Sequence, residues 1–235
     1  MDKIVYSLFD GSGIMVRDWA DAGCKCYCFN ADSADHKGYS QYRIVHENIT
    51  YVNLWIGLDF EDKVKELGIP EPDIIFGFPP CTNIAVSGAA HFKEKLKRNP
   101  LVQIQAVQTA KIVAFLGDYY SVPYMLENPV SVLSTMWRKP DYTFHPYEFS
   151  MYLFTEPEHP VFPEYIADMD MYPKKTCLWT GNGFNYPVKQ FSTEPSGYST
   201  QHLKLGGKSA KTKIIRSFTP RGFSKAVFCA NINSI

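Results

Sequence analysis

The chain has 235 residues, of which 45% are hydrophobic and 20% are charged, so its composition is that of a globular protein long enough for one large domain. Its formal net charge is zero, and no apolar run approaches the roughly 18 residues of a membrane-spanning helix. Residues 1–11 have the pattern of a strand and not of a signal peptide. The six cysteines show no zinc-ribbon, C-x-x-C or disulfide-framework spacing. We therefore expect a cytoplasmic protein without a metal site.

The charged residues are unevenly distributed along the chain. From Lys174 to the C-terminus there are ten Lys or Arg residues and one acidic residue, Glu194, whereas residues 1–173 contain 14 basic and 23 acidic residues. A basic segment of this kind favours contact with a polyanion, and the alternative is a basic surface that contacts only solvent.

The first half of the chain alternates between strand and helix patterns. The expected strands cover 3–9, 24–30, 42–49, 73–78 and 122–126, and the expected helices cover 14–22, 60–68 and 101–117. Cys24, Cys26 and Cys28 fall on one face of the second strand, where we expect small buried side chains. The alternation predicts an α/β fold with a doubly wound, mostly parallel sheet.

The pattern changes after residue 137. Residues 138–173 are rich in proline, aromatic and acidic residues without a clear period. Residues 175–180 predict a further strand, residues 197–213 a loop with several lysines, and residues 219–232 a helix with Thr219 as N-cap and Pro220 in its first turn. We expect a single domain over 1–235, with 138–213 as an irregular insertion on the substrate side.

Four unusual loops follow expected strands. Ligands of a doubly wound sheet bind at the carboxyl ends of its strands. These loops are Asp10–Gly13, Asn30–Asp32, Pro79–Cys81 and Glu127–Pro129. In the first loop, glycine lets the backbone approach a ligand, and the helix that follows favours a carboxylate or phosphate. Asp32 or Asn30 is then placed to bond a ribose hydroxyl, and Asn48 and Ile49 to contact a purine. The alternative for each is a plain turn residue.

Cys81 and Glu127 are candidates for chemistry. In the stretch 76–82, "FGFPPCT", two prolines take the chain out of the sheet and restrict the approach of Cys81, which favours a nucleophile over a packed cysteine. Glu127 leaves an apolar strand between Leu126 and Pro129, which predicts an acid with a raised pKa. A thiol beside such an acid suits attack on an unsaturated heterocycle. A Cys–His hydrolase is the competing interpretation, although none of the six histidines stands in a recognisable triad setting.

Together these motifs resemble the S-adenosylmethionine-dependent DNA cytosine-C5 methyltransferases. Residues 9–13, "FDGSG", resemble the cofactor loop of that family, 77–82 its G-x-P-P-C motif, and 126–129, "LENP", its E-N-V motif. Residues 216–220, extended by Arg221, resemble its R-x-x-T-P-R-E motif. The order agrees across about 1–130 and again 213–232. Stretches such as "AVSGAAHF" and "LGGKSAKTKIIRS" are similar to compact phage-encoded members.

The resemblance implies a Rossmann-like class I methyltransferase fold in a bacterial or phage-infected cell. It implies that Cys81 attacks C6 of cytosine and that Glu127 bonds N3 and the exocyclic amine, while Pro80 and Asn128 complete the catalytic motifs. C5 would then receive the methyl group of S-adenosylmethionine. The residues implied at the cofactor are Phe9, Asp10, Gly11, Ser12, Gly13, Asn30, Asp32, Asn48, Ile49, Phe78, Pro79 and Thr219.

The chain departs from the family in two ways. It lacks the Q-x-R-x-R motif, for which Arg138 or Arg216 is a candidate substitute, with Lys208 as a further substrate residue. It also lacks a full target-recognition domain, since only 88 residues separate Glu127 from Arg216. An alternative substrate is therefore a free cytidine nucleotide, dCMP or dCTP, with the lysines of 206–213 on its phosphates. A third possibility is a cofactor- or partner-binding protein without activity.

Overall fold

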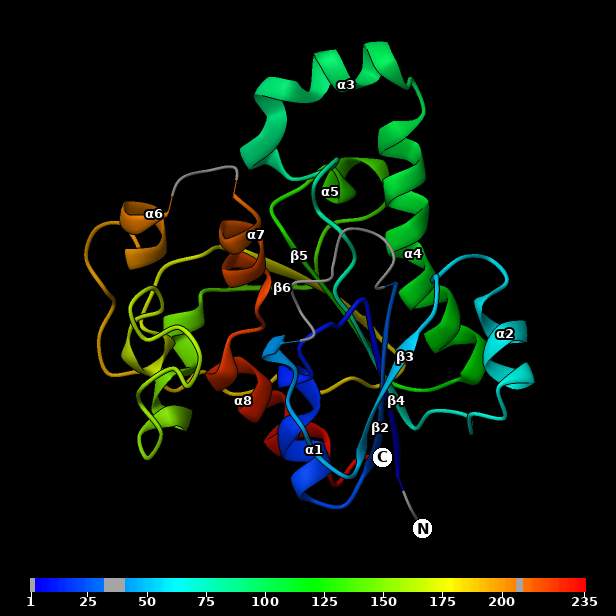
Figure 1. Ribbon diagram of the computed structural model, residues 1–235, viewed down its shortest axis with the longest axis horizontal. Coiled ribbons are helices and arrows are strands. Elements are labelled where there is room, and N and C mark those ends of the chain that lie inside the picture. Colours follow the sequence, from blue (N-terminus) through cyan, green and yellow to red (C-terminus); the bar gives the residue numbers. More distant parts are fainter. Residues whose placement is uncertain (1–2, 32–40, 206–208) are drawn as a thin grey trace.

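A single mixed sheet organises the molecule. The computed structural model describes residues 3–31, 41–205 and 209–235, and in these ranges the chain forms a seven-stranded sheet of order β3-β2-β1-β4-β5-β7-β6 (Figure 1). The first five strands in the chain pair in parallel, and β7 is antiparallel to both β5 and β6. The strands are β1 (Ile4–Leu8), β2 (Lys25–Asn30), β3 (Ile49–Asn53), β4 (Ile74–Gly77), β5 (Tyr124–Pro129), β6 (Tyr142–Phe144) and β7 (Thr176–Gly181).

This strand order confirms the expected fold class. The sheet runs outward from β1 in both directions, as in a doubly wound Rossmann-like fold. An antiparallel β7 inserted between β5 and β6 gives the arrangement of class I methyltransferases. Both β6 and β7 come from residues 138–213, so part of that region completes the sheet.

Helices cover both faces of the sheet. Helices α2 (Phe60–Glu66) and α4 (Val102–Tyr120) pack on one face, and α1 (Arg17–Asp21) and α8 (Arg221–Asn231) pack on the other (Figure 1). The remaining helical segments are α3 (Phe92–Arg98), α5 (Leu133–Met136), α6 (Thr200–Lys204), α7 (Ala210–Ser217) and the 3-10 turns η1 (Ile14–Val16), η3 (Val86–His91), η4 (Pro146–Leu153) and η5 (Asp168–Asp170).

Two apolar cores result from this layering. Tyr6 and Leu8 of β1 pack with α2 and α4, whereas Val5 packs with Trp19 of α1 and Phe223 of α8. Successive residues of a strand point to opposite faces, so a strand buried on both sides is apolar throughout. The three cysteines of "CKCYC" are buried in the second core, as expected.

The third strand was predicted seven residues too early. The strand is Ile49–Asn53, paired with β2 from Cys26↔Ile49 to Asn30↔Asn53, and not 42–49. Its alternation of β-branched and aromatic residues suits the partner strand. Upstream, the amide of Ile44 donates to the carbonyl of Ser12 at 3.0 Å, so this segment crosses the loop after β1 instead of joining the sheet.

Two further predictions about the C-terminal region are wrong. The expected loop 197–213 contains helices α6 and α7, which begin after Ser199 and Ser209; each serine oxygen accepts the backbone N–H three residues later. At α8 the N-cap is Pro220 and not Thr219, and no side chain at that position caps the helix. The carboxylate of Asp170, distant in sequence, accepts the N–H of Arg221 instead.

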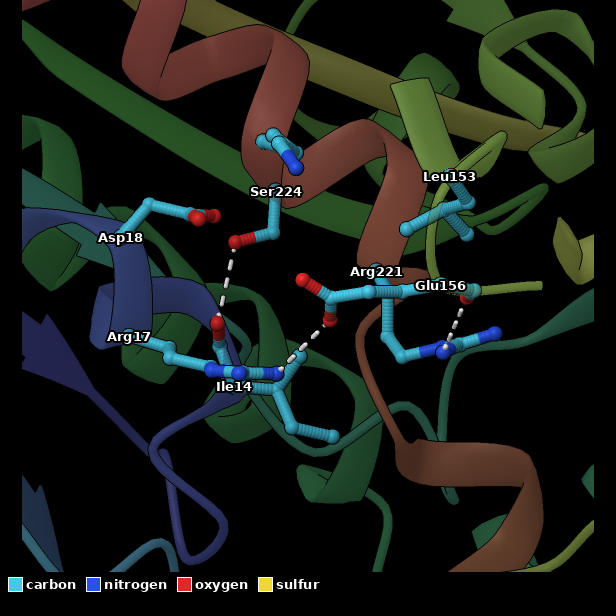
Figure 2. A pocket seen from close by; sticks show the side chains of 8 residues that line it. Ile14, Arg17, Asp18, Leu153, Glu156, Arg221 and Ser224 are labelled. Atoms are coloured by element: carbon cyan, nitrogen blue, oxygen red, sulfur yellow. Dashed lines mark hydrogen bonds and ion pairs between the residues drawn. The ribbon is translucent and has the colours of Figure 1, made fainter. Parts of the chain in front are cut away.

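Arg221 fastens the insertion to the rest of the fold. Its guanidinium donates to the carbonyls of Glu156, Pro157 and Glu158 and to the buried carboxylate of Asp170. Figure 2 shows this junction, where Glu156 also pairs with Arg17 of α1 at 3.4 Å. The match of Arg221 to a family motif thus coincides with a structural role in holding the insertion against α8.

The ring of Tyr124 at the start of β5 lies against two glycines. A Cβ on Gly117 or on Gly181 would overlap this ring. We predict that Gly117→Ala lowers the free energy of unfolding by about 1–3 kcal/mol, because a tight core cannot absorb the added methyl group. Urea titration measures this loss. Gly88→Ala is the matched control, since a Cβ there meets nothing within 4 Å; equal losses in both variants would contradict the packing explanation.

Candidate functional site

Three strand ends meet at one edge of the sheet. The amide of Phe78 donates to the carbonyl of Leu8 at 3.0 Å, and Gly77 pairs with Leu126. The chain segments that follow β1, β4 and β5 are therefore neighbours. The structure brings together the loop Phe9–Gly13, the turn Phe78–Cys81 and the pair Glu127–Asn128.

The loop after β1 is organised by Asp10. One carboxylate oxygen of this buried residue accepts the N–H groups of Ser12 and Gly13 at 2.8 Å each and the Ser12 hydroxyl, and the other accepts the hydroxyl of Ser7. Phe9 has a φ of 59°, a conformation rarely adopted by a bulky residue. These bonds hold Gly11 and its neighbours in an open turn at the strand end.

Position 13 accepts only a glycine. Its φ is 76°, and an added Cβ would overlap the hydroxyl of Tyr51, which lies 3.0 Å from the carbonyl oxygens of Ser12 and Ile44. Glycine is therefore required both for the left-handed conformation and for the close approach of Tyr51.

The turn that carries Cys81 is bonded to the last residues of β5 and to the segment that follows them. The Asn128 side-chain amide donates to the carbonyl of Pro79 at 2.9 Å. The carbonyl of Cys81 accepts the N–H groups of Ile84 and Ala85, and Val86 bonds Val130. Cys81 and Glu127 thus stand on two segments that are joined on both sides of the site.

The environment changes the pKa values of both reactive groups. Burial raises the pKa of the Cys81 thiol, the Glu127 carboxylate raises it further, and the ammonium groups of Lys174 and Lys95 act in the opposite direction. Burial also raises the pKa of Glu127, opposed by Lys174. The expectation of a raised pKa at Glu127 is confirmed, and this acid is suited to donating a proton.

Two buried polar atoms beside this turn have no partner. In the described part of the chain, Asn128 Oδ1 and Ser131 Oγ accept or donate no hydrogen bond, although Asn128 is 1% exposed and Ser131 4%. Such atoms are costly unless a ligand or water satisfies them. Two such atoms beside the turn that carries Cys81 mark this edge of the sheet as a candidate ligand site.

Several predicted residues lie elsewhere. Asn48 and Ile49 stand at the amino end of β3, where Asn48 donates to the carbonyl of Ala20, so they lie at the opposite edge from Cys81 and we propose no purine contact for them. This follows from the shifted strand. Residues 53–56, which the sequence reasoning missed, occupy the carboxyl end instead, and Leu54 bonds the carbonyl of Asn30.

The arginines predicted to contact the substrate lie in different parts of the structure. Arg138 is held near the amino end of β5 by Asp141 and the carbonyl of Thr180, away from Cys81, so we propose no substrate contact for it. The side chain of Arg216 is exposed at the end of α7. Thr219 is buried just before α8. Asp32 and Lys208 lie outside the described residues.

The charge of Lys174 lowers the pKa values of Cys81 and Glu127, although the sequence pattern did not single this residue out. It stands two residues before β7, whose pairing with β5 places Thr176 opposite Pro129 and Leu178 opposite Glu127. The sequence does show a pair of lysines, Lys174 and Lys175, at the start of a predicted strand. It does not show that this strand pairs with β5.

Comparisons with known proteins do not assign the chain to a family. No protein-family model and no curated protein sequence matches the chain. One solved structure, described as a "putative DNA modification methyltransferase" encoded within an E. coli prophage, aligns with a TM-score of 0.40 and 13% identity over 88% of this chain and 49% of that one. This chain thus spans about half of its length, and a similarity this low assigns no function.

Residues 3–31, 41–205 and 209–235 contain no helix long and apolar enough to cross a membrane. The same ranges contain no group of three or more His, Cys, Asp or Glu side chains arranged to hold a metal ion.

The raised pKa of Glu127 has a consequence for stability. An ordinary glutamate ionises near 4.5. Above that pH the unfolded chain ionises before the folded one, so the contribution of Glu127 to stability falls as the pH rises from 4.5 through its higher folded pKa. We predict that Glu127→Gln is more stable than the natural chain at neutral pH, by up to about 1 kcal/mol, and equal to it at about pH 4.

Urea titration at both pH values measures this difference. Glu66→Gln, at an exposed carboxylate, is the control and should leave the stability unchanged. A Glu127→Gln variant that is less stable than the natural chain at neutral pH would show that the carboxylate is stabilised in the fold.

Proposed function

We propose that this chain is an S-adenosylmethionine-dependent methyltransferase that modifies C5 of cytosine in DNA. The observation that carries the proposal is the placement of Cys81 and Glu127 at the ends of the neighbouring strands β4 and β5, joined by the bond from Asn128 to Pro79. The sheet order of the class I fold supports it, as do the motifs "FDGSG", "GFPPCT" and "LENP".

In this proposal the two side chains act on opposite sides of one ring. The thiol of Cys81 releases its proton to solvent and attacks C6 as a thiolate, while the neutral acid of Glu127 donates a proton to N3, so no negative charge accumulates on the base. Breaking the C5–C6 double bond makes C5 nucleophilic. After C5 is methylated it loses its proton to water, the bond from Cys81 to C6 breaks, and the N3 proton returns to Glu127.

The residues at the end of β1 fit the methyl donor. S-adenosylmethionine, when bound, supplies an electrophilic methyl group. The open turn Phe9–Gly13, held by Asp10, would lie against it, with Asn30 at the end of β2 and Phe78 and Pro79 between donor and base. Thr219, before α8, is the expected residue near the methionine end.

Two observations bear on the form of the substrate. Lys211, Lys213 and Arg216 of α7 are exposed, and such side chains suit the phosphates of a nucleic acid. The strands β6 and β7, however, occupy part of 138–213, which leaves little chain for a surface that reads sequence. We prefer DNA and keep a free cytidine nucleotide, dCMP or dCTP, as the alternative.

Trapping with 5-fluorocytosine tests the chemistry. Fluorine at C5 cannot leave as a proton, so the adduct with Cys81 should persist through denaturing electrophoresis once the methyl group has been transferred. We expect a covalent complex with the natural chain and none with Cys81→Ser, and we expect Glu127→Gln to form it about 10²–10⁴ times more slowly, because it cannot donate the proton.

The form of the substrate is read from the same experiment. Duplex DNA, single-stranded DNA and the free nucleotide, each carrying 5-fluorocytosine, are offered separately with the methyl donor. Adducts with DNA support the preferred substrate, and an adduct with the nucleotide alone selects the alternative. Cys229→Ser, at an exposed cysteine, should trap normally. No adduct with any of the three would contradict the proposal and favour a binding protein without activity.

A further inference from the structure

The side of α4 that faces away from the sheet carries large apolar side chains. Ile104, Phe115 and Tyr119 on this side are between 45% and 59% exposed. The solvent-facing side of a helix in a globular protein is normally polar, because only the opposite side packs on the core. Figure 1 shows α4 along the outside of the molecule, next to α2. The exposed side of α4 therefore has the composition of a contact surface.

A hollow of about 900 Å³ lies beside this side of α4. It is lined by Phe115 and by Trp55 and Leu58 from the segment between β3 and α2. Trp55 is 64% exposed and Leu58 97%. We call the surface formed by Trp55, Leu58, Ile104, Phe115 and Tyr119 the α4 face. Exposed apolar side chains that gather around a hollow mark a site of interaction, whereas single ones do not.

The aromatic side chains of the α4 face are held in place before any partner binds. The rings of Phe115 and Tyr119 are stacked, with centroids 6.2 Å apart. The hydroxyl of Tyr119 donates to Glu61 of α2 at 3.0 Å and accepts from the ammonium of Lys65 at 3.1 Å. Aromatic side chains fixed in this way lose little conformational entropy on binding, and they are common anchors of protein interfaces.

The charges around the α4 face are balanced. Glu61 and Lys65 pair with each other on α2, and α4 presents one exposed side chain of each sign, Lys111 and Asp118. Asp118 also accepts from Asn182 at 3.2 Å, which fixes its position. A surface without an excess of positive charge does not attract a nucleic acid or an anionic membrane. The α4 face therefore suits another protein surface.

We propose that the α4 face binds the α4 face of a second copy of this chain, with the two helices antiparallel. In a two-fold interface, the contact of one residue with another occurs twice, once from each copy. Lys111 and Asp118 lie about two helical turns apart, on either side of Phe115. A two-fold axis that crosses α4 at right angles beside Phe115 therefore places Lys111 of each copy opposite Asp118 of the other.

The charge pattern selects the antiparallel arrangement. Parallel helices related by a two-fold axis would bring Lys111 against Lys111 and Asp118 against Asp118, and like charges that face each other across an interface are unfavourable. In the antiparallel arrangement both pairs are of opposite sign. The two Phe115 side chains then meet near the axis, at the centre of the contact, where the anchors of an interface usually lie.

The exposed area is sufficient for a stable contact. A fully covered aromatic side chain buries about 150–250 Å². At their exposed fractions, Trp55, Phe115 and Tyr119 together offer roughly 350 Å² per copy. Two copies thus contribute about 700 Å² from aromatic side chains alone, against the roughly 1,200–2,000 Å² of a standard interface. Leu58, Ile104 and the charged rim supply further area.

The proposed contact leaves the edge of the sheet that carries Cys81 open. Helix α4 ends at Tyr120, just before the amino end of β5. Phe115 and Tyr119 therefore lie toward the edge of the sheet opposite to Cys81. The inference does not depend on the proposed function, since it concerns a different surface of the molecule.

Analytical ultracentrifugation of the full chain over about 1–100 µM tests the proposal. We expect the natural chain to reach the mass of a dimer as its concentration rises. Phe115→Ser should raise the dissociation constant of the dimer at least about tenfold, because it removes the central anchor. Phe154→Ser is the matched control, since Phe154 is 71% exposed on η4 and lies outside the α4 face; it should leave the dissociation constant unchanged.

Reversal of the two charges tests the direction of the helices. Lys111→Glu opposes two acidic side chains in the antiparallel dimer, and Asp118→Lys opposes two lysines, so each variant should weaken the dimer at least about tenfold. The double variant restores opposite signs at both contacts and should associate within about threefold of the natural chain. Both positions are exposed, so these variants also decide the question if Phe115→Ser does not fold.

Three results would overturn the proposal. The first is a natural chain that stays monomeric over the whole concentration range. The second is a dimer that Phe115→Ser and Phe154→Ser affect equally, which would place the contact elsewhere. The third is a double charge variant that remains as weak as the two single ones, which would exclude the antiparallel pairing. Urea titration of each variant at a concentration where the chain is monomeric establishes that it is folded.

Discussion

The hydrogen bond from the Asn128 side chain to the carbonyl of Pro79 is the contact on which the site depends. The parallel pairing of β4 with β5 ends at Gly77 and Leu126. Beyond that point β5 continues along β7 to Pro129, whereas the chain after β4 leaves the sheet, and Pro79 and Pro80 have no N–H with which to continue the ladder. A side-chain amide replaces the missing backbone contact. This buried residue therefore helps to fix the distance between the turn that carries Cys81 and the strand that carries Glu127, together with the bond from Val86 to Val130 on the other side.

The position of Asn128 is also energetically unfavourable in one respect. Its amide nitrogen is satisfied, while its oxygen is buried without a partner in the described chain, and Ser131 nearby is in the same state. Glu127 adds a carboxyl group whose ionisation burial disfavours. A fold selected for stability alone would place apolar residues here. Unsatisfied polar atoms and a raised carboxyl pKa in one place are typical of a ligand site.

The charges of the site come from distant parts of the chain. Cys81 follows β4, Glu127 lies in the second half of β5, and Lys174 precedes β7. Strand β7 returns beside β5 only after the chain has passed through β6 and the insertion. The contacts of Arg221 with Asp170 and with residues 156–158 hold that insertion on α8. The route of the chain through residues 138–173 thus decides where β7, and the lysine before it, can lie.

The sequence by itself determined the features that depend on local chemistry. Apolar runs and helical spacing identified β1, β2, β4, β5, β7, α1, α2, α4 and α8. The prolines before Cys81 marked a strand end, because periodicity and the missing proline N–H act over a few residues. Only the tertiary structure decided what depends on partners. The pairing of β3 with β2 places Asn48 at the amino end of β3, far from Cys81. The pairing of β7 with β5 places Lys174 near the carboxyl end of β5. The carboxylate of Asp170 accepts the N–H of Arg221 at the start of α8 from 51 residues away. Pairing between distant segments leaves no local pattern from which it can be read.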